Sequence, residues 1–195
     1  PDDLTWSNKE KKTSIGATSK TDPKVWVKNE FTANDLIAYA GAQIKAINMH
    51  FSTPITGVTL WVMKNDEFVY SEVVSAVKVA GIAADSWARF ELKTPVTIEQ
   101  GANYSYGLFI KHAAGLKPIS VDTSNSIGVK GSTFSTSDQA STGFENSDPY
   151  WKYLADGNIP GNWMMTAEVK TASAPQYKIA GYDIYRNGEM IASNV

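Results

Sequence analysis

The sequence feature that most constrains the fold is a strict alternation of apolar and polar residues in two neighbouring runs between Gln43 and Lys64. A break at Pro54 and Gly57 separates the two runs. The apolar positions are Ile47, Met49 and Phe51 in the first run, and Val58, Leu60 and Val62 in the second. Because successive side chains of a β-strand point to opposite faces, a period of two is typical of a strand with one buried face. The two runs therefore predict a pair of β-strands.

The same alternation recurs along most of the chain and predicts an all-β sandwich. Further strands are expected at residues 24–31, 68–74, 87–92, 104–110 and 162–170, and the run 104–110 is long enough to be a central strand. The apolar phase shifts by one residue between Ala46 and Ile47, which predicts a β-bulge. Residues 9–23 are polar and are expected to form a loop, whereas residues 77–84 are expected to be an edge strand or a loop.

One short helix is expected at residues 33–40. Thr32 stands where an N-cap belongs, and Asp35, three residues later, completes a capping box with it. Gly41 fits the left-handed residue that ends many helices. A helix of two turns has little stability of its own, so packing must hold it.

The chain divides at a stretch that has the composition of a linker. Residues 1–170 are expected to form the sandwich, and residues 171–176 (Thr-Ala-Ser-Ala-Pro-Gln) the linker. In residues 177–195 an Asn187-Gly188 pair separates two apolar runs, which is a strong signal for a β-hairpin.

Charge and composition exclude several classes of function. The net charge of −2 comes from scattered charges without a basic cluster, so nucleic-acid binding is not expected. The absence of cysteine excludes disulfides and thiolate metal sites. No run of about 18 apolar residues is present, so no membrane-spanning segment is expected.

Four stretches carry a resemblance to a known group of modules. Gly181–Ala192 resembles the middle hairpin of fibronectin type III-like modules in secreted Bacteroidetes proteins. The stretches Phe31–Ile44, Thr94–Ile98 and Gly161–Val169 resemble the jelly-roll-like β-sandwich that commonly precedes such modules. The resemblance implies a jelly-roll-like antiparallel sandwich with one short helix, followed by a partial fibronectin type III-like hairpin.

These modules occur beside gingipain-type proteases and haemagglutinin-like adhesins. The resemblance therefore implies an exported module, extracellular or at the cell surface in association with the outer membrane. Its implied partners are a glycan or a host or cell-surface protein, together with neighbouring modules of a longer chain. It identifies no functional residue.

An aromatic loop is the strongest candidate binding site. Asp148, Tyr150, Trp151 and Tyr153 lie within six consecutive residues, next to a Gly-rich stretch of the chain, with Asn146 alongside. Glycans stack the C–H faces of their rings on exposed aromatic side chains, while nearby carboxylates and amides bind the hydroxyl groups. The alternative is that Trp151 plugs the end of the sandwich, and the sequence favours this plug slightly.

The residues for catalysis or for a metal ion are sparse. His50 and His112 are the only histidines, no Gly-x-Ser-x-Gly sequence is present, and we expect both to be structural or surface residues. No cofactor is expected. The loop carboxylates leave open a glycosidase pair or a structural calcium ion, with Asp122/Asn125 and Asp156–Asn158 as loose calcium candidates. They are Asp122, Asp138, Glu145, Asp148 and Asp156.

Two tryptophans, Trp61 and Trp87, fall on the polar phases of their strands. We expect them to be buried against the helix, and the alternative is that they are exposed ligand contacts.

The leading hypothesis for function is a non-catalytic extracellular binding or adhesion module that binds carbohydrate through the aromatic loop. The alternative is a structural spacer domain of a larger surface protein, and a glycoside hydrolase is the remote third reading.

Overall fold

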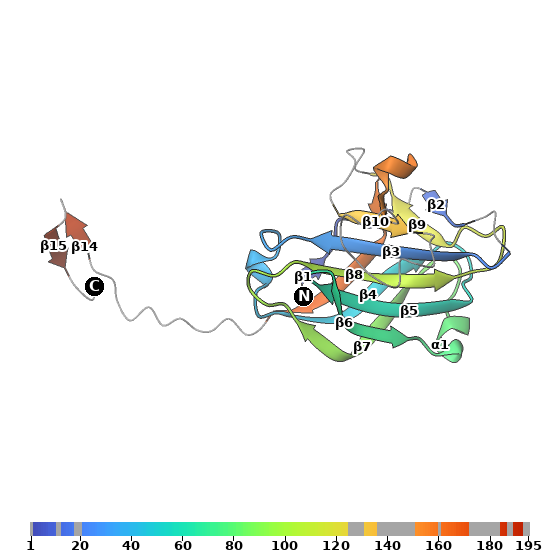
Figure 1. Cartoon of the computed structure of the whole chain (residues 1–195), viewed down its shortest axis with the longest axis horizontal. Helices are drawn as coiled ribbons and strands as arrows, with labels where there is room; N and C mark the ends of the chain where they lie inside the picture. Colours follow the sequence, from blue (N-terminus) through green and yellow to red (C-terminus); the bar gives the residue numbers. More distant parts are fainter. Residues whose placement is uncertain are drawn as a thin grey trace.

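The computed structural model of the chain describes residues 2–10, 13–17, 21–124, 131–135, 151–159, 161–171, 184–186 and 189–192. Figure 1 shows two β-sheets, one lying over the other. Every strand pair is antiparallel, so the chain is an all-β sandwich, as predicted.

One sheet has seven strands, in the order β1-β13-β4-β9-β12, with β7 paired to β4 and β2 paired to β9. Its strands are β1 (Asp2–Leu4), β2 (Thr13–Ile15), β4 (Gln43–Phe51), β7 (Ser86–Thr97), β9 (Ile119–Asp122), β12 (Asn162–Trp163) and β13 (Met165–Lys170). Strand β2 lies in the stretch that was expected to be a loop. The β4–β7 register shifts between Ile44 and Ala46, one position from the predicted bulge.

The other sheet has six strands, in the order β11-β10-β3-β8-β5-β6. Its strands are β3 (Lys24–Phe31), β5 (Gly57–Lys64), β6 (Glu67–Val73), β8 (Tyr104–Lys111), β10 (Ser132–Ser135) and β11 (Lys152–Tyr153). Strand β8 pairs with β3 and β5, which confirms it as a central strand.

The core lies between the two sheets and contains the alternating apolar residues. Ile47, Met49 and Phe51 of β4 are fully buried, and Phe51 meets Phe90 of β7 edge to face with ring centroids 6.3 Å apart. Each fully buried side chain of this size contributes roughly 1.5–3 kcal/mol through removal of apolar surface from water. The alternation therefore selects which face of each sheet is turned inward.

The two alternating runs are both strands, as predicted, but β4 and β5 do not pair with each other. Strand β4 belongs to the seven-stranded sheet and β5 to the six-stranded sheet. Alternation reports that one face of a strand is buried, but it does not report which strand is hydrogen-bonded to it. The chain between the two strands crosses from one sheet to the other.

The prediction of a helix at residues 33–40 is wrong, although its end signals are confirmed. Thr32 and Asp35 form the reciprocal capping contacts, and Gly41 has a φ of +79°. Between them the chain makes turns and one short 3-10 helix, Ile37–Tyr39. The Gly41 N–H donates to the carbonyl of Ile98, which ties this short segment to the end of β7.

The single α-helix of the described residues is α1 (Ala76–Ala80), in the stretch expected to be an edge strand or a loop. Ser75 caps it by accepting a hydrogen bond from the Lys78 N–H, and Val79 is its one buried residue. A helix this short has too few positions to show a period of 3.6, so the sequence pattern could not reveal it.

Strands β14 (Ile184–Arg186) and β15 (Glu189–Ala192) pair in a two-stranded sheet of their own, which confirms the hairpin. The Asn187-Gly188 pair and all of the expected linker except Thr171 lie outside the described residues.

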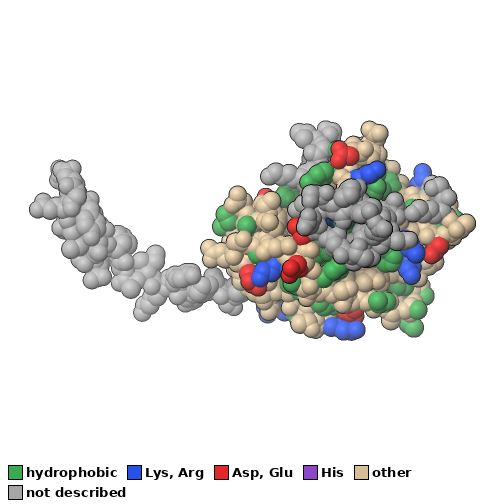
Figure 2. Space-filling view, in the orientation of Figure 1, with side chains coloured by type: hydrophobic (Ala, Val, Ile, Leu, Met, Phe, Trp, Pro, Cys, Tyr) green, Lys and Arg blue, Asp and Glu red, His purple; other side chains and the backbone are tan. Residues whose placement is uncertain are grey.

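Within the described residues, no helix has the length and apolar character needed to cross a membrane. Figure 2 shows acidic and basic side chains interspersed over the described part of one face.

Candidate functional site

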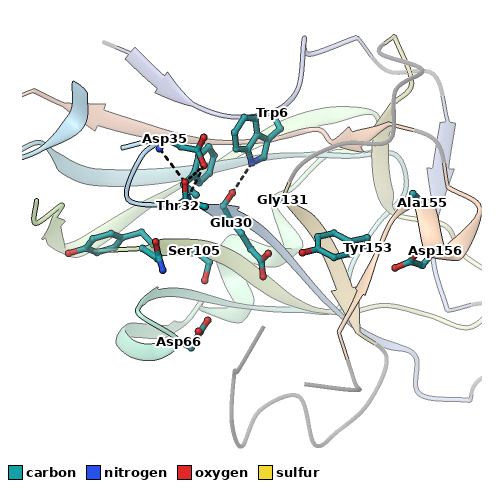
Figure 3. Close-up of a pocket in the computed structure, with 13 residues that line it drawn as sticks. Trp6, Glu30, Thr32, Asp35, Asp66, Ser105, Gly131, Tyr153, Ala155 and Asp156 are labelled. Atoms are coloured by element: carbon teal, nitrogen blue, oxygen red, sulfur yellow. Dashed lines mark hydrogen bonds between the residues drawn. The ribbon is translucent and has the colours of Figure 1, made fainter. Parts of the chain in front are cut away.

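One concave feature of the described residues is a cleft of about 480 Å³ at one end of the six-stranded sheet, shown in Figure 3. Its walls come from the end of β3, the turn after it, the β5–β6 turn, the start of β8, and the chain around β10 and β11. The described residues that line it include four acidic side chains and no basic one; the acidic ones are Glu30, Asp35, Asp66 and Asp156. A volume of this size falls within the range of about 300–1,000 Å³ that is usual for small-molecule sites.

One wall of the cleft is the indole of Trp6. Its Nε1–H donates to the backbone carbonyl of Glu30 over 2.9 Å, and its ring stacks on Phe31 with centroids 4.7 Å apart. Gly131 lies against the same indole with a φ of +84°, and a Cβ there would be 2.4 Å from the Glu30 carbonyl oxygen. Only glycine lets the chain pass this close, so Trp6 is held firmly in place.

A buried polar network supports this wall from below. The Asn162 amide donates to the carbonyl of Trp6 over 2.7 Å, and the Ser132 hydroxyl contacts the side-chain oxygens of Asn162 and Asn29. The Asn29 amide in turn donates to the hydroxyl of Tyr106. Burial raises the pKa of Tyr106. Because buried polar groups are costly unless paired, this network fixes the position of its members.

The acidic side of the cleft has two fixed carboxylates. Glu30 forms an ion pair with the buried ammonium group of Lys28. Asp35 accepts hydrogen bonds from the Thr32 N–H over 2.9 Å and from the Thr32 hydroxyl over 2.7 Å. Both side chains therefore present fixed acceptor oxygens at the rim.

Tyr153, from β11, is the aromatic side chain that reaches the cleft from the predicted loop, and 48% of its surface is exposed. Figure 3 shows its ring between Glu30 and Asp156. Partial burial and the negative charges of Glu30 and Asp156 raise the pKa of Tyr153. The ring face and the neutral hydroxyl thus border a negatively charged space.

Trp151 lies in a different environment, on the outer surface of the six-stranded sheet. It is half-buried and, like Phe109, packs against a hydrophobic cluster formed by Trp26, Trp61 and Met63. Its ring meets Trp61 edge to face, with centroids 6.2 Å apart, and lies over the Lys28 ammonium group. The packed alternative describes Trp151, with the difference that it covers a sheet face rather than the end of the sandwich.

The other candidates from the sequence are distributed over the molecule. Asp148, Tyr150 and Asn146 lie outside the described residues. Trp61 is fully buried, although against aromatic rings rather than a helix. The expectation that Trp87 is buried is wrong, because it lies on the outer face of β7 with 41% of its surface exposed.

The two histidines are buried and hydrogen-bonded within the fold. His112 Nε2 accepts from the Ala17 N–H. His50 Nδ1 lies 2.8 Å from Ser120 Oγ, and His50 Nε2 lies 3.9 Å from Asp85 Oδ1. A hydrolytic triad uses the opposite ring nitrogens, with Nε2 toward the serine and Nδ1 toward the aspartate. Ser120 is also fully buried, so its hydroxyl cannot reach a substrate.

Of the carboxylates considered for calcium or for a glycosidase pair, Asp138, Glu145 and Asp148 lie outside the described residues, and Asp156 lines the cleft. Asp122 is buried and accepts hydrogen bonds from the Ser7 hydroxyl, from the Asn8 N–H, and from both the N–H and the hydroxyl of Ser124. Asn125 lies outside the described residues. Among the residues that the structure describes, no group of three or more acidic or histidine side chains is placed to hold a metal ion.

Sequence reasoning missed Trp6, Glu30 and Asp66 as members of the site. They lie far apart in the chain, in a loop, a strand end and a tight turn, and no local pattern joins them. The Asn65 and Asp66 pair with positive φ values marks a tight hairpin turn, which is the one signal that was available for this corner.

Comparisons of the chain with known protein families, with curated proteins and with solved structures found no match.

Proposed function

We propose that this chain is a non-catalytic carbohydrate-binding module that holds a glycan in the cleft between Trp6 and Tyr153. The observation that carries the proposal is the half-exposed ring of Tyr153 beside fixed oxygen acceptors. Aromatic faces supply apolar contact at low cost in conformational entropy, and fixed polar groups orient the ligand. Hydroxyl-rich rings with apolar faces match this combination. The volume of about 480 Å³ accommodates a short stretch of such a chain.

The charge of the cleft restricts the class of glycan. Besides Glu30, whose charge is balanced by Lys28, three acidic side chains line the cleft, and they repel uronic acids and sulfated sugars because like charges at close range cost binding free energy. Neutral glycans and glycans with protonated amino groups avoid this repulsion. We therefore expect neutral or amino-bearing sugars to bind and acidic sugars to be excluded.

The contacts of the carboxylates favour binding without turnover. A glycosidase needs one carboxyl group that delivers a proton and a second that acts as nucleophile or base. Glu30 is paired with Lys28, and Asp35 accepts two hydrogen bonds from Thr32. These contacts suit fixed acceptors better than groups that exchange protons during a reaction.

The test is binding of the full chain to immobilised neutral, amino-bearing and sulfated glycans. Tyr153→Ala should weaken binding at least tenfold, and Tyr153→Phe, which keeps the ring, should retain most of it. Binding to sulfated glycans only, or equal binding by Tyr153→Ala, would overturn the proposal. Release of reducing sugar from the bound glycans would show turnover instead.

A structural spacer is the second candidate, and the placement of Trp151 favours it. A spacer needs no exposed aromatic platform, and Trp151 packs onto Trp61 and Lys28. A spacer should bind none of the glycans tested. The exported, cell-surface location belongs to the same proposals and depends on the resemblance described above.

A further inference from the structure

The outer face of the seven-stranded sheet contains an exposed aromatic ring in polar surroundings. Trp87 lies on β7 opposite His50 of β4, and 41% of its surface is exposed. Two hollows, of about 270 Å³ and 300 Å³, adjoin its indole, and neither includes a residue of the cleft described above. The first is lined by Asp3, Lys9, Asn48, Trp87, Thr166 and Glu168.

The ring of Trp87 is held in place from the sheet side. The His50 imidazole meets the indole edge to face, with centroids 5.6 Å apart and an interplanar angle of 86°. His50 is itself fixed by its contact of 2.8 Å with Ser120 Oγ. A ring fixed before binding loses little conformational entropy when a ligand stacks on it. Trp87 is therefore suited to act as a stacking platform.

The polar groups beside the platform are also fixed. Arg89 donates from Nε and Nη2 to the two oxygens of Glu168, over 2.8 and 2.9 Å. The Asn48 amide donates to Glu168 over 3.0 Å. The hydrogen bond from Arg89 lowers the pKa of Glu168, so this carboxylate stays ionised at neutral pH. A bidentate pair of this kind holds both partners in one geometry.

The charges around the first hollow are paired with charges of opposite sign. Arg89 pairs with Glu168, and Lys9 pairs with Asp3. A charged ligand would have to compete with one of these pairs, whereas a neutral ligand with hydroxyl groups can share their spare donor and acceptor positions. Charge complementarity therefore selects a neutral ligand that has an apolar ring face and a hydroxyl rim.

We propose, on the basis of the glycan-binding function proposed above, that Trp87 is the platform of a second glycan site that takes a neutral sugar. The pyranose ring stacks on the indole, and its hydroxyl groups bind Asn48 and the Arg89–Glu168 pair. With one site at the end of the six-stranded sheet and one on the outer face of the seven-stranded sheet, each chain has two sites and links two glycan segments.

The test is isothermal titration of the full chain with neutral hexasaccharides of glucose and of mannose, which gives the number of sites per chain. The wild type should bind two equivalents, and Trp87→Ala and Tyr153→Ala should each bind one. The double variant should bind none. Val77→Ala is the matched control, because Val77 is 86% exposed and lines neither hollow, and it should bind two.

The outcomes separate the two proposals. If Trp87→Ala binds as many equivalents as the wild type, the Trp87 site is overturned while the cleft stands. If Tyr153→Ala binds as the wild type does and Trp87→Ala binds none, the cleft is overturned while the Trp87 site stands. If the wild type binds no neutral hexasaccharide, the Trp87 site is overturned. Binding of amino-bearing glycans would then support the cleft site, and no binding of them would overturn it too. Circular dichroism and urea unfolding check that each variant is folded.

Discussion

The ammonium group of Lys28 lies 4.4 Å from the centre of the Trp151 ring, on the outer surface of the six-stranded sheet. The Lys28 side chain is fully buried and also forms an ion pair with Glu30, which lines the cleft. A cation over an indole face is stabilised more strongly when both are shielded from water. Trp151 therefore covers a buried charge and helps to hold one wall of the cleft.

Replacing Trp151 with alanine should reduce stability by about 2 kcal/mol. Loss of a large aromatic ring from a core costs roughly 3–5 kcal/mol, and Trp151 is only half-buried. The measurement is urea unfolding followed by circular dichroism. Trp151→Phe keeps a ring over Lys28 and should lose about half as much. An unchanged unfolding midpoint in Trp151→Ala would contradict the packed position of this side chain.

Replacing Gly107 with alanine should be much more disruptive, at about 3 kcal/mol, because overpacked positions force backbone shifts. Gly107 lies on the central strand β8, where a Cβ would be 2.0 Å from the Val27 carbonyl oxygen and 2.5 Å from the Trp61 ring. Gly57→Ala is the matched control, since its Cβ would meet Lys111 only at 3.4 Å. That variant should stay within about 1 kcal/mol of the wild type or gain stability. Similar unfolding midpoints for the two variants would refute the close contact of Trp61 with β8.

The sequence pattern predicted the strands well because the apolar residues that face the core between the two sheets recur at every second position. Strands β3, β5, β6 and β8 were expected within one or two residues of their ends. The same pattern could not assign strands to sheets, because hydrogen-bonding partners leave no local signal, and it did not reveal that β4 and β5 lie in different sheets. The capping residues Thr32 and Asp35 were identified correctly, but a cap can also close a turn.

The candidate site was harder to predict than the fold. Tyr153 was identified because exposed loop aromatics are conspicuous in a sequence. Trp6, Glu30 and Asp66 join it only after the strands have folded, and their separation in the chain hides this. Trp87 was assigned to burial because strands in a sandwich often have two covered faces. Which polar-phase aromatic is covered depends on what packs outside the sheet, and alternation does not record that.

Trp87 should account for most of the tryptophan fluorescence that acrylamide quenches. It is 41% exposed, whereas Trp61 and Trp163 are fully buried. Collisional quenching needs contact between acrylamide and the ring, so Trp87→Phe should lower the quenching constant more than any other single Trp→Phe change. Trp163→Phe is the control, and it should leave the amount of quenchable fluorescence unchanged, because the ring it removes is fully buried. A larger decrease for Trp163→Phe would contradict the exposure of Trp87.

Stability should fall in acid because of Asp122, which joins the N-terminal segment to β9. Burial alone would raise the pKa of Asp122, but hydrogen bonds from Ser124, Ser7 and Asn8 outweigh it and lower the pKa. A pKa lower in the folded than in the unfolded chain, where it is about 3.9, adds stability that is complete above that value. This stability is lost as the pH falls from about 5 through the folded-state pKa. Asp122→Asn should cost about 2 kcal/mol at pH 7, since hydrogen bonds to a charged group are strong.

The decisive measurement is the urea unfolding midpoint of Asp122→Asn at several pH values between 7 and 2. At pH 7 the variant should be less stable than the wild type, and the difference should shrink as the wild type loses its charge advantage in acid. Asp22→Asn is the control, because the Asp22 side chain is 73% exposed and its contact with Lys24 is 3.6 Å long. Exposed pairs contribute about 0–1 kcal/mol, so this variant should follow the wild type at every pH. Parallel curves for Asp122→Asn and the wild type would mean that the Asp122 network does not tie its charge to folding.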